Sequence, residues 1–184
     1  MNYSIQQTKL DGLLIFEYSS ASLSDEFFTE SFNQSSFNDA INSNHFKFVQ
    51  DNQSKSVKNV LRGMHYQINF PQAKLIRVLN GSIFDVAIDL RKNSKTFRQW
   101  FGIELTADSR NQIWIPPGFA HGFLTISDSA EILYKTTDYW YPEYERTLLW
   151  SDPEINIEWP ILSPPILAPK DANGVLFKNA EVYE

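Results

Sequence analysis

The chain contains no cysteine among its 184 residues. Disulfide bonds and thiolate catalysis are therefore excluded. Histidine is also scarce: there are three residues of this type, and no His-x-His pair occurs. A complete set of metal ligands is hard to assemble from so few histidines, so we expect neither a metal centre nor a metal cofactor.

Long apolar runs are missing as well. No stretch approaches the roughly 20 apolar residues that a membrane helix needs. The first ten residues, MNYSIQQTKL, have no cationic region followed by an apolar core, so no secretory signal is expected. The formal net charge of −6 argues against general nucleic-acid binding. These absences predict a cytoplasmic protein with no nucleic-acid partner and no membrane partner.

Aromatic residues, by contrast, are abundant: 14 Phe, 8 Tyr and 5 Trp make up 15% of the chain. They favour strands and a pocket with flat walls. Segments rich in β-branched and aromatic residues predict strands at residues 75–79, 83–90, 100–105, 119–126 and 131–139. Asn80-Gly81, between the first two, is a signal for a hairpin turn. Many short strands with close turns favour an all-β sandwich or barrel.

Two local patterns add detail to this expectation. Ser35 and Ser36 are suited to cap a short helix or turn over residues 37–41. Along the strand at 83–90, an apolar face alternates with a face that carries Asp85 and Asp89.

The domain organisation is expected to be simple. There is no internal repeat, low-complexity tract or linker. From Asp152 onward the chain is rich in proline, which predicts an extended tail that wraps the body. We therefore expect one domain over residues 1–184, with an N-terminal strand segment and a C-terminal wrapping tail. A chain of this length buries about two thirds of its unfolded surface.

Residues 61–67 read LRGMHYQ and place His65 near several cations. A lone histidine in a strand is most simply a packed core residue. The cluster of Arg62, Lys74 and Arg77 in an acidic protein instead suggests an anionic ligand. In an ideal strand Arg62 and His65 point to opposite faces. Either Gly63 permits a bulge that brings them together, or the two residues serve different sides.

Residues 113–124 read IWIPPGFAHGFL and carry the second notable histidine, His121. It is either a packed imidazole between two phenylalanine rings or a functional group. Tyr134, in EILYKTTDYW, is by itself most simply a packing residue. Lys170 and Asp171 lie in the tail, and Asp171 gains interest only if the tail folds back against His65. The third histidine, His45, lies in a polar stretch and receives little functional weight.

Five long segments resemble one enzyme family in order along the chain. They read FVQDNQSKSVKNVLRGMHYQ, PQAKLIRVLNGSIFDVAIDLRKNSKTF, QIWIPPGFAHGFL, LYKTTDYW and LLWSDPEINIEWP. Together they are similar to the dTDP-4-dehydrorhamnose 3,5-epimerases. The resemblance implies an all-β, double-sheet jelly roll of the cupin type with a few short helices, assembled as a homodimer and without a metal or other cofactor. Metal-binding cupins use a His-x-His pair as the first half of their ligand set, and this chain lacks it.

The resemblance also implies a reaction and the residues that carry it. The substrate is a dTDP-linked 4-keto-6-deoxyhexose, whose C3 and C5 are inverted by proton removal and return through an enolate. His65 corresponds to the base, Tyr134 to the acid, Asp171 to the partner of the imidazole and Lys74 to the cation beside the enolate oxygen. Substrate-binding positions of the family match Glu30, Gln50, Asp51, Asn52, Arg62, His121, Glu145 and Lys170.

Two departures from the family pattern concern substrate binding. The family usually carries an Arg-Gly pair before a Phe-Phe segment, and its arginine touches the substrate, often in the partner subunit. Here Asp25-Glu26 occupies these places, and Gln53 replaces the usual histidine after Asp-Asn. We expect retained chemistry with altered affinity or nucleotide preference. Two alternative functions remain open: epimerisation at C3 or C5 alone, and binding of the sugar nucleotide without catalysis.

Overall fold

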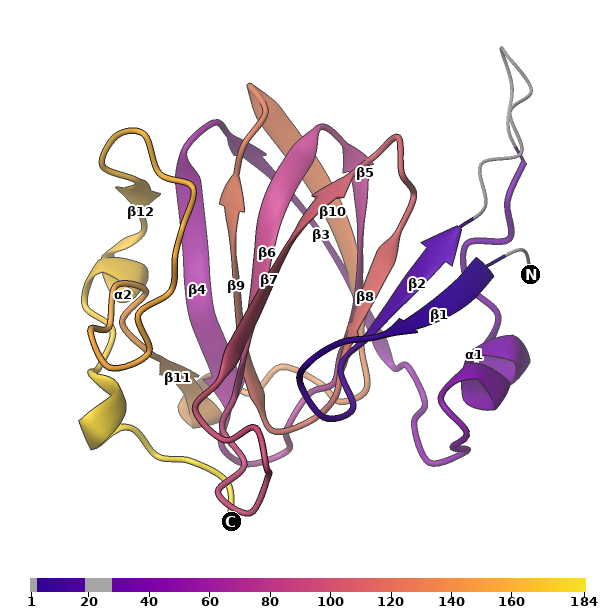
Figure 1. Ribbon diagram of the computed structural model, residues 1–184, viewed down its shortest axis with the longest axis horizontal. Coiled ribbons are helices and arrows are strands. Elements are labelled where there is room, and N and C mark those ends of the chain that lie inside the picture. The colour runs from indigo at the N-terminus through magenta and orange to yellow at the C-terminus, as the bar shows by residue number, and fades with distance from the viewer. Residues whose placement is uncertain (1–2, 19–27) are drawn as a thin grey trace.

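The computed structural model describes residues 3–18 and 28–184, which form two facing antiparallel sheets (Figure 1). The first sheet has the order β1 (Tyr3–Gln7), β2 (Leu14–Tyr18), β8 (Gln112–Ile115), β5 (Lys74–Asn80), β10 (Ser129–Thr136) and β3 (Gln50–Val57). The second has the order β11 (Glu145–Thr147), β4 (Val60–Gln67), β9 (Phe119–Thr125), β6 (Ser82–Asp89) and β7 (Trp100–Thr106), and β12 (Ile166–Leu167) pairs in parallel with β4. The helical elements are short: α1 (Gln34–Ala40), η1 (Pro142–Tyr144), α2 (Pro169–Ala172) and η2 (Phe177–Asn179). The double-sheet jelly roll expected from the sequence is confirmed.

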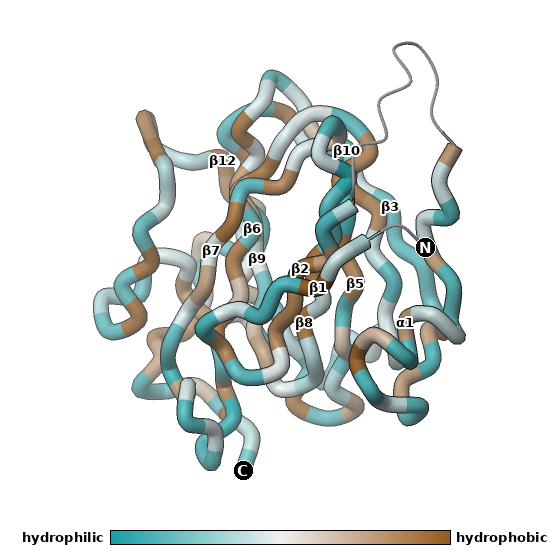
Figure 2. Tube along the Cα trace, turned by 45° about the vertical axis from the view of Figure 1, so that its right-hand side comes forward, coloured by the Kyte–Doolittle hydropathy of each residue, from teal (hydrophilic) through white to brown (hydrophobic). Residues whose placement is uncertain are grey.

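Apolar side chains pack in three layers. The central layer, which includes Ile76, Ile113 and Phe123, lies between the two sheets. A second layer covers the outer face of the first sheet, where Phe37 of α1 packs against Trp114. Figure 2 shows brown, hydrophobic stretches along β2, β8 and β5, the strands that contribute to this second layer. The third layer lies on the outer face of the second sheet, so both sheets are buried on both sides over much of their area.

The turn at Asn80-Gly81 is present, but the predicted hairpin is wrong. Gly81 has a φ of 75°, a conformation that favours glycine. The strands on either side do not pair: β5 pairs with β8 and β10, whereas β6 pairs with β7 and β9. The turn therefore passes the chain from one sheet to the other, which local turn chemistry alone does not reveal.

The predicted strands are otherwise found with shifts of a few residues, and the helix begins earlier than expected. The cap of α1 is Asn33, whose side chain accepts a hydrogen bond from the Ser36 amide at 3.2 Å. Alternation along β6 holds, yet both of its faces are buried. Val86 and Ile88 pack in the outer layer, while Asp85 and Asp89 are fully buried on the inner side. Neither carboxylate is a solvated surface group, and each has a specific partner.

The C-terminal segment packs against the second sheet. β12 and α2 lie beside β4, at the yellow end of the colour scale in Figure 1. Ile155, Trp159 and Phe177 from this segment pack onto the outer face of the second sheet. The tail thereby covers the outer side of the strand that carries His65.

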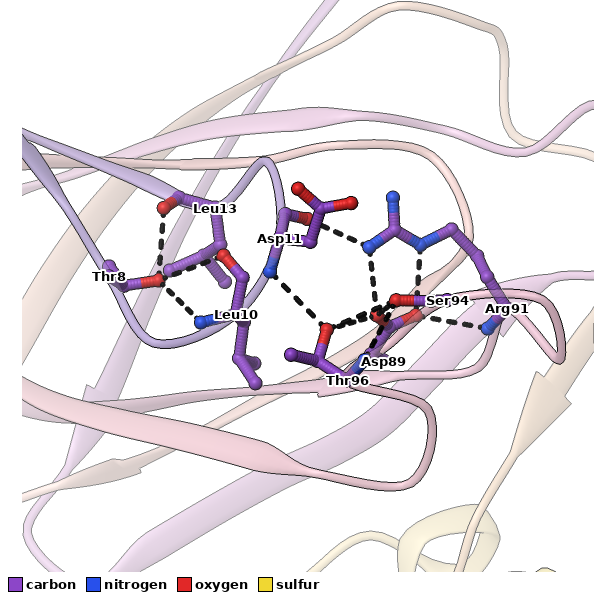
Figure 3. A network of polar contacts seen from close by, with 8 residues as sticks. All are labelled: Thr8, Leu10, Asp11, Leu13, Asp89, Arg91, Ser94 and Thr96. Atoms are coloured by element: carbon purple, nitrogen blue, oxygen red, sulfur yellow. Dashed lines mark hydrogen bonds and ion pairs between the residues drawn. The ribbon is translucent and has the colours of Figure 1, made fainter.

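Asp89 anchors a network that ties the β1–β2 turn to the loop after β6 (Figure 3). Its carboxylate accepts hydrogen bonds from the Arg91 guanidinium at 2.9 and 2.8 Å and from the hydroxyls of Ser94 and Thr96 at 2.5 and 2.7 Å. Arg91 and Thr96 also bond the backbone of Asp11. Burial raises the pKa of Asp89, but these hydrogen bonds lower it more, so the net pKa lies below its usual range.

We predict that Asp89→Asn will destabilise the fold by about 3 kcal/mol, because it removes the charge and one acceptor from a buried, fully used carboxylate. A carboxylate with a lowered folded-state pKa stabilises above the unfolded pKa of about 3.9 and loses that contribution as pH falls through the folded pKa. Unfolding in denaturant should therefore show a large difference from the unsubstituted chain at neutral pH and a smaller one in acid. Asp11→Asn is the matched control, because only the backbone of Asp11 takes part. Equal effects of the two substitutions would contradict the prediction.

Candidate active site

A cavity of about 440 Å³ opens between the two sheets. Strands of both sheets contribute to its walls, and the tail contributes at its rim. Polar and ionisable side chains dominate the lining, which consists of Gln50, Asn52, Ser54, Arg62, His65, Tyr66, Gln67, Gln72, Lys74, His121, Phe123, Ile132, Tyr134, Trp140, Glu145 and Lys170. The cavity therefore brings together most of the residues that the sequence predicted as functional.

A shift in register along β4 resolves the question of Arg62 and His65. The pairing of β4 with β9 slips between these two residues, and both line the cavity. Gly63 lies at the slip with a φ of 130°, and a Cβ there would come within 2.5 Å of the Gly122 Cα. Only glycine permits so close an approach of the two strands. Of the two interpretations left open by the sequence, the bulge is the one found.

His65 is paired with Asp171. The imidazole Nε2 lies 2.6 Å from Oδ1 of Asp171, which α2 brings back from the tail. The Asp171 side chain is only 1% exposed, whereas that of His65 is 22% exposed and faces the cavity. A carboxylate accepts hydrogen bonds, so Nε2 carries the proton and Nδ1 is left as the basic atom of the neutral ring. The arrangement suits a histidine that takes up a proton.

His121 forms a second histidine–carboxylate pair, with Asp85. Its Nε2 lies 2.8 Å from Oδ2 of Asp85, and both side chains are almost completely buried. Burial lowers the pKa of His121, and the attraction of Asp85 does not reverse that shift. His121 is consequently neutral at physiological pH, with Nε2–H donated to Asp85 and Nδ1 available as an acceptor. It is therefore better suited to accept a hydrogen bond from a substrate hydroxyl than to supply a positive charge.

Lys74, at the start of β5, supplies a cation without a partner. Within the described residues its Nζ makes no hydrogen bond or ion pair, although the residue lines the cavity. Burial lowers its pKa to about 8, against opposing effects from Asp85 and Glu145. The amine is thus still protonated near neutral pH. An unpaired ammonium group in a buried cavity is well suited to an oxygen that develops negative charge.

Tyr134 enters the cavity from the opposite side to His65. It lies on β10 of the first sheet, whereas His65 lies on β4 of the second sheet. Burial is the main cause that raises the pKa of Tyr134 above its ordinary value, so the phenol is a proton donor at physiological pH. A histidine and a tyrosine therefore face the same space from two walls, which is the arrangement needed to remove a proton from one face of a ring and return it to the other.

Charged groups surround the mouth of the cavity. Nζ of Lys170 lies 2.9 Å from a carboxylate oxygen of Glu145, and the Nε of Arg62 donates to the Ser56 hydroxyl at 3.2 Å. Arg62 and Lys170 supply positive charge for an anionic ligand.

Within the described residues, no group of three or more histidine, aspartate or glutamate side chains is arranged to hold a metal ion. Among the residues that the structure describes, no helix is long and apolar enough to cross a membrane.

Two predicted substrate contacts do not reach this cavity. Asp51 is the neighbour of Gln50 and Asn52 on β3, and alternation turns its side chain away, where it pairs with Lys135 at 2.9 Å. Glu30 lies outside the lining as well. The departure at Asp25-Glu26 falls outside the described residues.

Several cavity residues were not predicted as functional. Ser54 continues the alternation of Gln50 and Asn52, so the strand pattern could have found it. Asp85 was placed correctly on one face of its strand, but nothing local in the sequence indicates that His121 lies opposite.

Comparison with known proteins identifies the family of this chain. The family model for dTDP-4-dehydrorhamnose 3,5-epimerase matches residues 7–179. A dTDP-4-dehydrorhamnose 3,5-epimerase of Pseudomonas aeruginosa is 52% identical over 157 residues, which cover 85% of this chain and 86% of that protein. One of Shigella flexneri is 48% identical over 181 residues, covering 98% and 99%.

A solved structure agrees in fold as well. The dTDP-6-deoxy-D-glucose-3,5-epimerase of Legionella pneumophila, in complex with dTDP-4-keto-L-rhamnose, superposes with a TM-score of 0.93 at 42% identity and covers 97% of this chain and 95% of that one. The likeness extends over nearly the whole described fold, including both sheets and the tail. The chain belongs to the dTDP-4-dehydrorhamnose 3,5-epimerase family.

Proposed function

We propose that this chain inverts C3 and C5 of a dTDP-4-keto-6-deoxyhexose, as an isomerase in deoxysugar biosynthesis of the dTDP-rhamnose type. One observation carries the proposal: His65 and Tyr134 extend from facing sheets into one cavity that also holds the unpaired Lys74. Protons on carbons beside a ketone are acidic because the resulting enolate spreads its charge onto the carbonyl oxygen. Inversion then requires that the proton return from the other face.

His65 acts as the base in this proposal. Its free Nδ1 removes the proton from carbon, and Asp171 stabilises the imidazolium that forms. Asp171 is almost inaccessible and has no other side-chain partner among the described residues, so its charge is directed at this ring. The pair therefore fixes both the tautomer and the orientation of the base.

Tyr134 acts as the acid and Lys74 as the stabiliser of the enolate. The phenol returns a proton to the opposite face, and the ammonium group lies beside the 4-keto oxygen. The ketone itself is the electron sink, so no cofactor is required. His121, held neutral beside Asp85, accepts a hydrogen bond from a sugar hydroxyl.

Other residues of the lining bind the diphosphate and the nucleotide. Arg62 and Lys170 hold the diphosphate, and Glu145 positions the Lys170 side chain. Gln50 and Asn52 face the same space and bond each other at 2.9 Å, which supports a role in binding the nucleotide.

We also propose that the chain works as a homodimer, a property that comes from the family resemblance. Phe28 is 98% exposed, and Glu30 lies outside the cavity of its own chain. Both are better explained if this segment contacts a second copy, where Glu30 and the side chain of Phe28 would approach the partner's substrate.

A cytoplasmic location remains a prediction from the sequence.

The test of the proposed function is hydrogen exchange at carbon. The folded protein, incubated with the dTDP-linked 4-keto-6-deoxyhexose in deuterated water, should introduce deuterium at both C3 and C5, because each proton removed is replaced from solvent. NMR of the recovered sugar measures both positions. Label at one carbon alone would establish single-site epimerisation instead, and no label at either carbon would remove the catalytic proposal.

Two substitutions should separate the base from the acid. His65→Asn should lower exchange at carbon by at least about 100-fold while dTDP still binds, because only the base is lost. Tyr134→Phe should retain exchange but impair inversion, since the proton then returns to the face from which it left. The measurement is the ratio of label incorporation to inverted product. A normal ratio in Tyr134→Phe would exclude Tyr134 as the acid.

The alkaline limb of the pH dependence of kcat/KM should reflect the loss of the proton from Lys74. Because its pKa lies at about 8, kcat/KM should fall as pH rises through that value and the amine loses its charge. Burial keeps the pKa of Tyr134 above its ordinary value, so the phenol does not cause this loss. Lys74→Arg retains a positive charge throughout this range and should remove the alkaline decline from whatever activity it keeps. An unchanged decline in Lys74→Arg would contradict the assignment.

A further inference from the structure

The segment from Asp138 to Tyr141 contributes Trp140 to the cavity wall, and it pairs with no strand in the part of the chain that the structure describes. It follows β10 and carries Trp140 into the cavity lining. Within the described residues, neither Tyr139 nor Trp140 makes a hydrogen bond between backbone groups. Because polar backbone groups must be satisfied, something else has to hold this segment in place.

Side chains hold that backbone. The Thr136 hydroxyl donates to the Asp138 carbonyl at 2.9 Å, and the Asp138 carboxylate accepts from the Tyr139 amide at 2.8 Å. The other contacts come from three glutamines. Gln72 donates to the Asp138 carbonyl at 2.9 Å. Gln50 accepts from the Trp140 amide at 3.2 Å. Gln67 makes two contacts: it donates to the Tyr139 carbonyl at 3.1 Å and accepts from the Tyr141 amide at 2.6 Å.

Gln67 is the central member of this set. Its side chain also donates to the Phe70 carbonyl at 2.9 Å, so both amide hydrogens and the amide oxygen are used. It is 3% exposed, and no other described side chain bonds two residues of the segment. On β4 it lies two residues after His65, hence on the same face of the strand. β4 therefore carries both the proposed base and Gln67, whose side chain acts as a clamp on the backbone of residues 139–141.

We infer that Gln67, supported by Gln72, is a positioning residue for the nucleotide half of the substrate. The inference rests on the proposed function. The reacting sugar lies between His65 and Tyr134, so the nucleotide extends toward the mouth of the cavity. There Trp140 lines the cavity, is about half exposed and offers a flat apolar face. The clamp fixes the distance of this wall from the reacting centre.

The chemistry of the clamp makes a specific demand on residue 67. Only an amide supplies two donors and an acceptor at that position. Methionine has a similar length and suits the buried site, but it offers neither donor. Without the Gln67 amide, the segment from Asp138 to Tyr141 should bind the nucleotide more weakly. The distance between His65 and the sugar ring is set by the sheets and should be unaffected.

The experiment compares Gln67→Met, Gln72→Met and Tyr183→Phe in the full chain. Tyr183 is the matched control, because its hydroxyl donates to the backbone carbonyl of Gln67 and leaves the side-chain amide untouched. Isothermal titration with dTDP gives the dissociation constant, and turnover of the keto sugar nucleotide gives KM and kcat. We expect Gln67→Met to raise both the dissociation constant and KM about tenfold. The kcat should stay within about twofold, and Tyr183→Phe should bind like the unsubstituted chain.

The outcomes are distinguishable. Unchanged dTDP binding by a folded Gln67→Met protein would overturn the inference, and so would a loss confined to kcat. If Gln67→Met does not fold, Gln72→Met decides: a rise of about threefold in the dissociation constant supports the clamp, and no rise overturns it. Absence of turnover by the unsubstituted chain would defeat the proposed function alone, because dTDP binding still reports on the clamp.

Discussion

The site depends on how closely β4 approaches β9. A side chain at Gly63 would collide with the backbone of Gly122, so the two strands come this near only because glycine occupies the position. The slip in pairing that accompanies this approach turns Arg62 and His65 toward one cavity. A regular strand would place the cation and the imidazole on opposite sides of the sheet. The combination of anion binding and proton transfer that we propose for this site therefore originates in a local irregularity of the backbone.

Buried charge is the second constraint, and the chain meets it by pairing. Asp85 and Asp171 each accept a hydrogen bond from a histidine with one carboxylate oxygen. In the part of the chain that the structure describes, the other oxygen of each has no hydrogen-bond partner. Isolated buried charges are costly, so these carboxylates need positive or polar neighbours. Asp85 serves twice: it fixes the tautomer of His121, and it opposes the lowering of the Lys74 pKa by burial. Without such a neighbour, the cation would be closer to losing its proton at neutral pH.

The sequence predicted the features that depend on local patterning, and it missed those that depend on which strands become neighbours. Strand positions, the wrapping tail and the grouping of most site residues followed from composition, alternation and the family resemblance. The Asn80-Gly81 turn was recognised, but its passage between sheets depends on the pairing of β5 and β6 with distant strands. Asp51 was predicted as a ligand contact, yet alternation along β3 turns it outward toward Lys135. The role of Asp85 is visible only once β6 lies beside β9.

The proposed base is complete only after the tail has docked. Asp171 lies 106 residues from His65 along the chain, and it reaches the imidazole because β12 pairs with the start of β4 and α2 follows directly. Lys170, on the same turn, arrives at the cavity mouth by the same docking and meets Glu145. The tail thus supplies a base partner and a cation together, and its pairing with β4 holds them on the strand that carries His65. Docking of the C-terminal segment is therefore required to assemble the proposed catalytic centre.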